Sequence, residues 1–190
     1  MTHPSPTELL VLHAVRLKGH ADSAAVAARF GLDAHDTHEY LLDAQAHGWV
    51  AKASFADLTG WSLTGTGRQR NESQLRDELD GIDARGTVDA VHEDFLPFNA
   101  QASRLFTAAQ LGSAGDIHGQ LADIADALRD LERRLTARLT RFSGYHDRFA
   151  IALAKSIDDP AWLTAIEVDS CHRVWFELHE DLIATLNLSR

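Results

Sequence analysis

The stretch Leu63–Arg68, with the sequence LTGTGR, constrains the fold of this chain more than any other. Its first two residues end a strand candidate, Trp61–Thr64, and the residues after it form a polar segment that continues to Leu79. The stretch therefore marks where a strand ends and a helix begins. An earlier run, Trp49–Ala53, predicts a partner strand, with residues 54–60 as the turn between the two. The sequence therefore predicts one strand pair within a chain that is otherwise helical.

Three short amphipathic segments precede the strand pair. The first spans residues 6–19, with apolar residues near a period of 3.6. Asp22 or its neighbour Ser23 is suited to cap the second segment. The second and third segments meet at a tight turn, Gly31–Asp33, where glycine supplies a positive φ and Asp33 can cap the next helix. The spacing predicts three helices, the last two arranged as a helix-turn-helix.

The order of these features resembles the winged helix-turn-helix domains of MarR- and PadR-like bacterial regulators over residues 7–79. The resemblance rests on three motifs in order: Phe30–Leu32, Leu41-Leu42 followed by Gly48–Val50, and Leu63-Thr64 followed by Gly67-Arg68. It implies a DNA-binding domain over residues 1–80 with a two-stranded wing. It further implies a transcription regulator that binds a palindromic operator as a homodimer, with the third helix in the major groove.

The resemblance also selects candidate DNA contacts. They lie at the start of the third helix, on the first strand and on the helix after the wing: His35, Thr37, His38, Lys52, Arg68 and Arg70.

The charge of the chain opposes this interpretation. The formal net charge is -10, and up to Asp80 there are seven Lys and Arg against eleven Asp and Glu. Cations that neutralise phosphates supply most non-specific DNA affinity. The first two turns of the third helix contain Asp36 and Glu39 but no Lys or Arg. An adaptor that contacts a protein partner instead of DNA is therefore the alternative hypothesis.

The C-terminal half predicts an all-α region over residues 87–190, used for a helical bundle or for dimerisation. Glycines at both ends of Gly81–Gly86 mark the boundary. Pro97 is expected to kink or split the helix that follows. Apolar residues spaced 4, 3, 4, 3 and 4 apart over Ile117–Leu135 form a heptad seam. The pattern fits a helix of an intramolecular bundle and a dimer seam equally well.

The end of the chain predicts a single long helix. Asp159-Pro160 would start it, with proline in the first turn, and an apolar stripe continues to Leu186. In regulators of the resembling kind, such a helix is a dimerisation element. A small apolar or aromatic effector could bind among aromatic and histidine side chains of this half: Phe95, Phe98, Trp162, His172 and Trp175.

Other classes of function find no support in the residues. A single cysteine, Cys171, excludes an internal disulfide. The eleven histidines match no compact zinc pattern, and no phosphate-binding glycine loop or nucleophile elbow occurs. We therefore expect no metal, no cofactor and no enzyme activity. The chain starts without a signal-peptide pattern and has no apolar run long enough to span a bilayer, which predicts a cytoplasmic protein without membrane contact.

Overall fold

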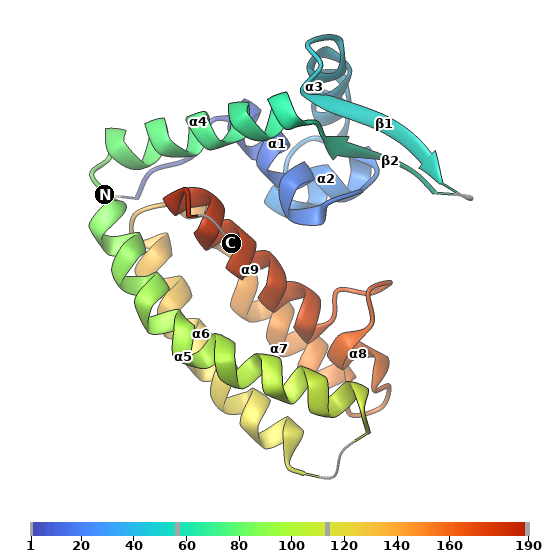
Figure 1. Cartoon of the computed structure of the whole chain (residues 1–190), viewed down its shortest axis with the longest axis vertical. Helices are drawn as coiled ribbons and strands as arrows, with labels where there is room; N and C mark the ends of the chain where they lie inside the picture. Colours follow the sequence, from blue (N-terminus) through green and yellow to red (C-terminus); the bar gives the residue numbers. More distant parts are fainter. Residues whose placement is uncertain (1, 56–57, 113–114, 189–190) are drawn as a thin grey trace. The chain divides into compact units, whose positions relative to one another are not determined.

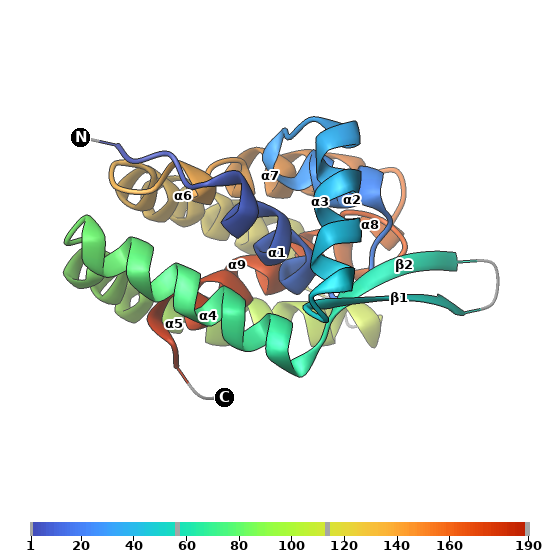
Figure 2. The ribbon, with the colours of Figure 1, turned by 90° about the horizontal axis from the view of Figure 1, so that it is seen from above.

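A computed structural model describes residues 2–55, 58–112 and 115–188 of the chain (Figures 1 and 2). It is mainly helical with one two-stranded antiparallel sheet. In chain order the elements are α1 (Thr7–Lys18), α2 (Ser23–Phe30), α3 (Ala34–Ala46), β1 (Val50–Phe55), β2 (Leu58–Leu63), α4 (Gly65–Gly81), α5 (Arg85–Gln110), α6 (Ile117–Thr136), the 3₁₀ turn η1 (Thr140–Phe142), α7 (Tyr145–Lys155), α8 (Ala161–Thr164) and α9 (Cys171–Leu186).

The chain divides into two compact units, and the division falls between Asp83 and Ala84. The hairpin unit comprises Pro4–Asp83 together with Ile183–Arg190, and the bundle unit comprises Met1–His3 together with Ala84–Leu182. The main division lies within residues 81–86. The sequence did not predict that each end of the chain belongs to the unit formed mainly by the other half of the chain. A local sequence pattern does not indicate which distant element a terminus packs against.

In the hairpin unit, α1, α2 and α3 surround an apolar core that the hairpin also enters. Its fully buried members come from all five elements: Val11, Leu12, Ala14, Val15, Val26, Leu41, Ala44, Val50 and Trp61. Residues at i, i+3 and i+4 on α1 fall on one face, which explains why this helix supplies several of them. The strands pair in register from Val50 with Leu63 to Phe55 with Leu58, and the hairpin extends away from the helices (Figures 1 and 2).

Local capping defines where these helices begin and turn. The Asp22 carboxylate accepts from the Ala25 backbone N–H at 2.7 Å, and Asp33 accepts from His35 and Asp36 at 2.9 Å. Gly31 adopts a left-handed conformation with φ of 63° between α2 and α3. Both predicted caps and the predicted turn are therefore confirmed.

The LTGTGR stretch joins β2 to α4 through a set of backbone contacts. The Thr64 hydroxyl accepts from the Gly67 N–H at 3.0 Å and so caps α4. The same hydroxyl donates to the Gly48 carbonyl oxygen at 2.6 Å, and the Thr64 N–H donates to the Trp49 carbonyl oxygen at 3.0 Å. A Cβ at Gly67 would lie 1.8 Å from that Trp49 oxygen. Only glycine permits this approach, which gives the motif its physical basis.

The strands differ in extent from the sequence prediction. Each was predicted about one residue out of place and too short, since Trp49 precedes β1 and Thr64 follows β2. Pairing extends to Phe55 with Leu58, and in the pair before it the Ser54 and Thr59 hydroxyls hydrogen-bond at 2.7 Å. The predicted turn over 54–60 is therefore mostly strand, and its centre, 56–57, lies outside the described residues.

The bundle unit packs α6 against α5 and α7. All predicted seam positions of α6 after Ile117 are buried within this single chain: Leu121, Ile124, Leu128, Leu131 and Leu135. The intramolecular bundle is thus the correct alternative for this seam, because its apolar face is already covered.

Helix α5 continues through Pro97 from Arg85 to Gln110, so of the two predicted effects of this proline the split does not occur. One prediction for this unit is wrong. The expected long terminal helix is divided into α8 and α9, and Ala165 between them is extended with ψ of 146°. Ser170 restarts the helix, since its hydroxyl accepts from the Arg173 N–H at 3.3 Å. The apolar spacing persists across the break, which is why it suggested one helix.

The last residues of α9 complete a second small core in the hairpin unit. Ala184 packs there with Leu9 of α1 and Leu75 of α4, and each of the three is at most 2 % exposed. In the bundle unit, the start of the chain is held by backbone hydrogen bonds, since His3 donates to the Arg138 oxygen and accepts from Thr140. Each unit therefore includes a segment from the opposite end of the chain.

Candidate nucleic-acid interface

The exposed face of α3 is the surface that a helix-turn-helix would present to DNA. His35, His38, Glu39 and Leu42 follow one another at i, i+3, i+4 and i+7, so they share one side of the helix. His35 and Glu39 are exposed, His38 is half-buried, and Leu42 is 41 % exposed. The opposite side, which includes Leu41 and Ala44, enters the core.

Thr37 lies on the buried side of α3, with only 1 % of its surface exposed. Its hydroxyl therefore has no access to a base, and the prediction that Thr37 contacts DNA is wrong. The sequence prediction included it because it took whole turns of the helix and not one face.

His38 belongs to a small hydrogen-bonded group at the base of the hairpin. Its Nδ1 and the Ser23 hydroxyl hydrogen-bond at 2.9 Å, and Trp61 Nε1 donates to the same hydroxyl at 2.9 Å. The imidazole also meets the Trp61 ring edge-on, with the centroids 6.2 Å apart. This group joins α2, α3 and β2, so it fixes how α3 lies beside the hairpin.

The predicted cations lie on the hairpin and on the first turns of α4. Lys52, Arg68 and Arg70 are all exposed. Lys52 Nζ lies 5.0 Å from the centre of the Trp61 ring, and the Arg70 guanidinium lies 5.4 Å from the centre of the Trp49 ring. A cation over an aromatic face is held by the ring's quadrupole, which limits the positions its charge can take.

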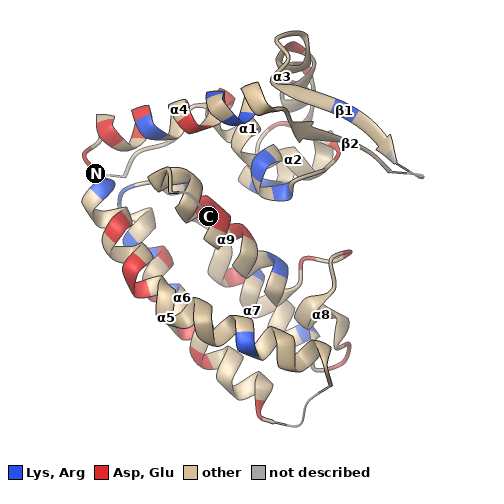
Figure 3. Cartoon of the chain, viewed as in Figure 1, with Lys and Arg blue, Asp and Glu red and all other residues tan. Residues whose placement is uncertain are grey.

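Carboxylates dominate the charge of α3 itself. Asp36, Glu39 and Asp43 are all exposed, and Figure 3 shows acidic and no basic residues on this helix. Burial raises the pKa of Tyr40, as do the charges of Glu8 and Asp43, while Arg70 lowers it. Arg70 therefore lies close enough to α3 for its charge to be felt there.

The predicted effector residues separate into core and half-buried positions. Phe95 and Trp175 are buried and stack at 4.9 Å, and Trp175 Nε1 donates to the Asn99 side chain at 2.9 Å. These two rings are used in packing. Phe98, Trp162 and His172 are half-buried on α5, α8 and α9. Burial lowers the pKa of His172, and Lys155 Nζ lies 4.0 Å from the centre of the Trp162 ring.

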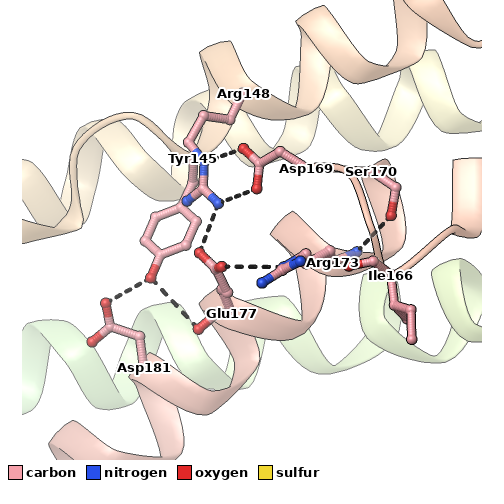
Figure 4. Close-up of polar contacts among 8 residues, drawn as sticks. All are labelled: Tyr145, Arg148, Ile166, Asp169, Ser170, Arg173, Glu177 and Asp181. Atoms are coloured by element: carbon pink, nitrogen blue, oxygen red, sulfur yellow. Dashed lines mark hydrogen bonds and ion pairs between the residues drawn. The ribbon is translucent and has the colours of Figure 1, made fainter. Parts of the chain in front are cut away.

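Sequence reasoning missed a buried polar network in the bundle unit (Figure 4). Asp181 of α9 accepts from Arg141 at 2.5 Å and from the Tyr145 hydroxyl at 2.8 Å, and both charged side chains are fully buried. A weak signal was available, because Glu177 and Asp181 interrupt the apolar side of α9 at a spacing of four. Their hydrogen-bond partners Arg141, Tyr145 and Arg148 are 29–40 residues away in sequence, so the pattern alone cannot name them.

Arg148 forms the second part of this network. It binds Asp169 through two hydrogen bonds of 2.6 and 2.7 Å and Glu177 through one of 2.7 Å. Burial alone would lower the pKa of Arg148, but the hydrogen bonds and charges of Asp169 and Glu177 outweigh it and raise the pKa. Arg173 Nε lies 4.0 Å from the Glu177 carboxylate, so three arginines face three carboxylates in the network. We interpret the network as a structural clasp that holds the segment before α9.

Comparisons of the chain with protein-family models, with curated proteins and with solved structures found no match. Among the helices of the described residues, none is both long and apolar enough to cross a membrane. The described side chains include no group of three or more His, Cys, Asp or Glu placed to hold a metal ion.

Proposed function

We propose that this protein is a DNA-binding transcription regulator of the winged helix-turn-helix kind, acting as a homodimer on a palindromic operator. The order of α1, α2, α3, the hairpin and α4 carries the proposal. A capped helix follows a glycine turn and presents one exposed face beside an antiparallel hairpin. That arrangement suits insertion of a helix in the major groove with a hairpin alongside.

The cations around α3 support the proposal. Lys52 of β1 and Arg68 and Arg70 of α4 are exposed, and two of the three are held over tryptophan rings. Phosphate contacts position a protein on DNA and carry no sequence information. We assign these three residues to phosphate contacts and assign His35 and His38 to the groove.

Fluorescence polarisation with a labelled random-sequence duplex at low salt tests the proposal. Replacing Lys52, Arg68 and Arg70 by alanine should weaken binding, and the slope of log K against log salt should fall by about 0.9 for each phosphate that the variant no longer neutralises. Arg76→Ala is the matched control, because Arg76 is exposed further along α4. An absence of binding by the unmodified protein at low salt refutes DNA binding.

Dimerisation needs a surface other than the α6 seam, which is covered within the chain. Exposed apolar side chains of the bundle unit offer one, including Ile151, Ile157, Ile166 and Phe176. Sedimentation equilibrium of the full chain tests this part of the proposal, and a monomer at all concentrations would contradict it. An apolar or aromatic effector would bind near Phe98, Trp162 and His172, and calorimetry with small aromatic acids tests that part.

The acidic character of α3 favours a second candidate, an adaptor that binds a basic protein. Asp36, Glu39 and Asp43 surround the exposed Leu42, which is the composition expected for a basic partner with an apolar contact residue. Removing negative charge from α3 should have opposite effects on its affinity for DNA and on its affinity for a basic protein. Asp36→Asn together with Asp43→Asn should strengthen DNA binding under the first proposal and weaken partner binding under the second.

A further inference from the structure

We infer that Trp49 is a positioning residue for DNA binding, because its indole ring holds the Arg70 guanidinium ready for a phosphate. The inference rests on the proposed function and adds to its site a residue that acts through another. Two observations carry it, both from the place where α3, β1 and α4 meet. The Arg70 guanidinium lies over the Trp49 ring, 5.4 Å from its centre, and the ring has its own fixed contacts.

The Arg70 guanidinium is available to a ligand. Arg70 is exposed in the second turn of α4. Within residues 2–55, 58–112 and 115–188, its guanidinium forms no hydrogen bond and no ion pair. Carboxylates are nonetheless in range, because the charges of Glu8 and Asp43 act on Tyr40 together with that of Arg70. The contact with the Trp49 ring is therefore the interaction that fixes where this cation lies.

The Trp49 ring is itself held in place. His47 stacks on it, with the ring centres 4.6 Å apart and the planes 20° from parallel. His47 Nδ1 lies 2.8 Å from the Asp43 carbonyl oxygen, and it donates to that oxygen because a carbonyl only accepts. The Trp49 carbonyl oxygen accepts from the Thr64 N–H at 3.0 Å, which ties this residue to the start of α4. The indole therefore offers Arg70 a fixed surface.

A guanidinium that rests on an aromatic ring keeps its hydrogen-bond donors. The group is planar and its N–H donors lie along its edge, so one face can contact an indole while the edge binds a phosphate. Ordering a mobile side chain on binding lowers affinity, and a side chain that is already ordered avoids this loss. For the one side chain of Arg70, the gain in affinity is about two- to tenfold.

A double-mutant cycle, read by binding of a labelled random-sequence duplex at low salt, tests the inference. Trp49→Leu should weaken binding about two- to tenfold when Arg70 is present and should leave binding unchanged in an Arg70→Ala background. Lys52→Ala is the matched background, because Lys52 lies over the ring of Trp61 instead. There Trp49→Leu should keep its full effect. Trp49→Phe retains an aromatic face and should recover most of the loss.

The outcomes separate the inference from the proposed function. No binding by the unmodified protein overturns both. No loss from Trp49→Leu, or an equal loss with and without Arg70, overturns the inference alone, because a purely structural role would weaken binding in every background. Trp49 packs against the apolar core, so urea titration checks that Trp49→Leu folds. If it does not fold, His47→Ala takes its place in the cycle, since His47 is exposed just after α3. This variant should weaken binding about twofold with Arg70 present and not without it, and a loss independent of Arg70 overturns the inference.

Discussion

The close approach of Gly67 to Trp49 makes a sharp prediction about stability. In Gly67→Ala the new Cβ would lie 1.8 Å from the Trp49 carbonyl oxygen and 2.7 Å from its carbon. Both atoms are backbone, so no side chain can rotate away. The first turn of α4 must move by more than an ångström to restore ordinary contact, and this movement pulls Thr64 from its partners.

The expected cost follows from the interactions that the movement disturbs. Loss of the Thr64 cap costs about 1 kcal/mol, loss of its hydrogen bond to Trp49 about 1 kcal/mol, and overpacking about 1–3 kcal/mol. Alanine returns about 1 kcal/mol through its better helix propensity. We therefore expect Gly67→Ala to lower the free energy of unfolding of the hairpin unit by about 2–4 kcal/mol.

Gly65→Ala is the matched control, because it lies in the same first turn and a Cβ there meets nothing within 4 Å. It should be neutral or stabilise by up to about 1 kcal/mol. Native-state hydrogen exchange read by mass spectrometry measures both variants on peptides from β1 and β2. If the β1 and β2 peptides are as well protected from hydrogen exchange in Gly67→Ala as in Gly65→Ala, the steric reasoning is refuted.

Three further predictions concern the bundle unit. Arg141→Met should destabilise by about 3–5 kcal/mol in urea titrations, because it leaves the buried Asp181 carboxylate without its ion partner, and adding Asp181→Leu should recover most of the stability. Glu132→Gln should cost about 1 kcal/mol in the same assay, because that carboxylate caps α7 through the Gly144 and His146 N–H groups, and an unchanged midpoint would contradict this role. Burial raises the pKa of Cys171 from 9.0 to about 12, so iodoacetamide should label this thiol at pH 8 only after the protein unfolds. The neutral buried thiol contributes stability that is complete below pH 9. This contribution should disappear as the pH rises toward 12.

Local chemistry explains which parts of the fold could be predicted from the sequence. Asp22 and Asp33 cap helices within three residues of themselves, and Gly31 needs only its own φ. Such features are readable because cause and effect are adjacent in the chain. The order of helices and hairpin was predicted for this reason, while the family resemblance drawn from that order stays a prediction.

Long-range contacts explain what could not be predicted. The end of α8 and the restart at α9 accompany a segment in which Asp169 is held by Arg148, 21 residues earlier. Apolar spacing across that segment stays helical, so the break is invisible to periodicity. At the candidate interface, the same limitation affects Thr37, whose burial depends on how α3 packs. His35 and Lys52, which were predicted together with Thr37, are exposed.

The small core of Leu9, Leu75 and Ala184 has a consequence for how the chain acquires its structure during synthesis. The helices and hairpin of the first eighty-three residues emerge from the ribosome early, yet part of their packing waits until residue 184 has been made. Until then Leu9 and Leu75 lack one of the side chains that cover them. A gene fragment that ends at Asp83 would reproduce this unfinished state permanently, so the contiguous segment 4–83 is a poor substitute for the hairpin unit in binding experiments.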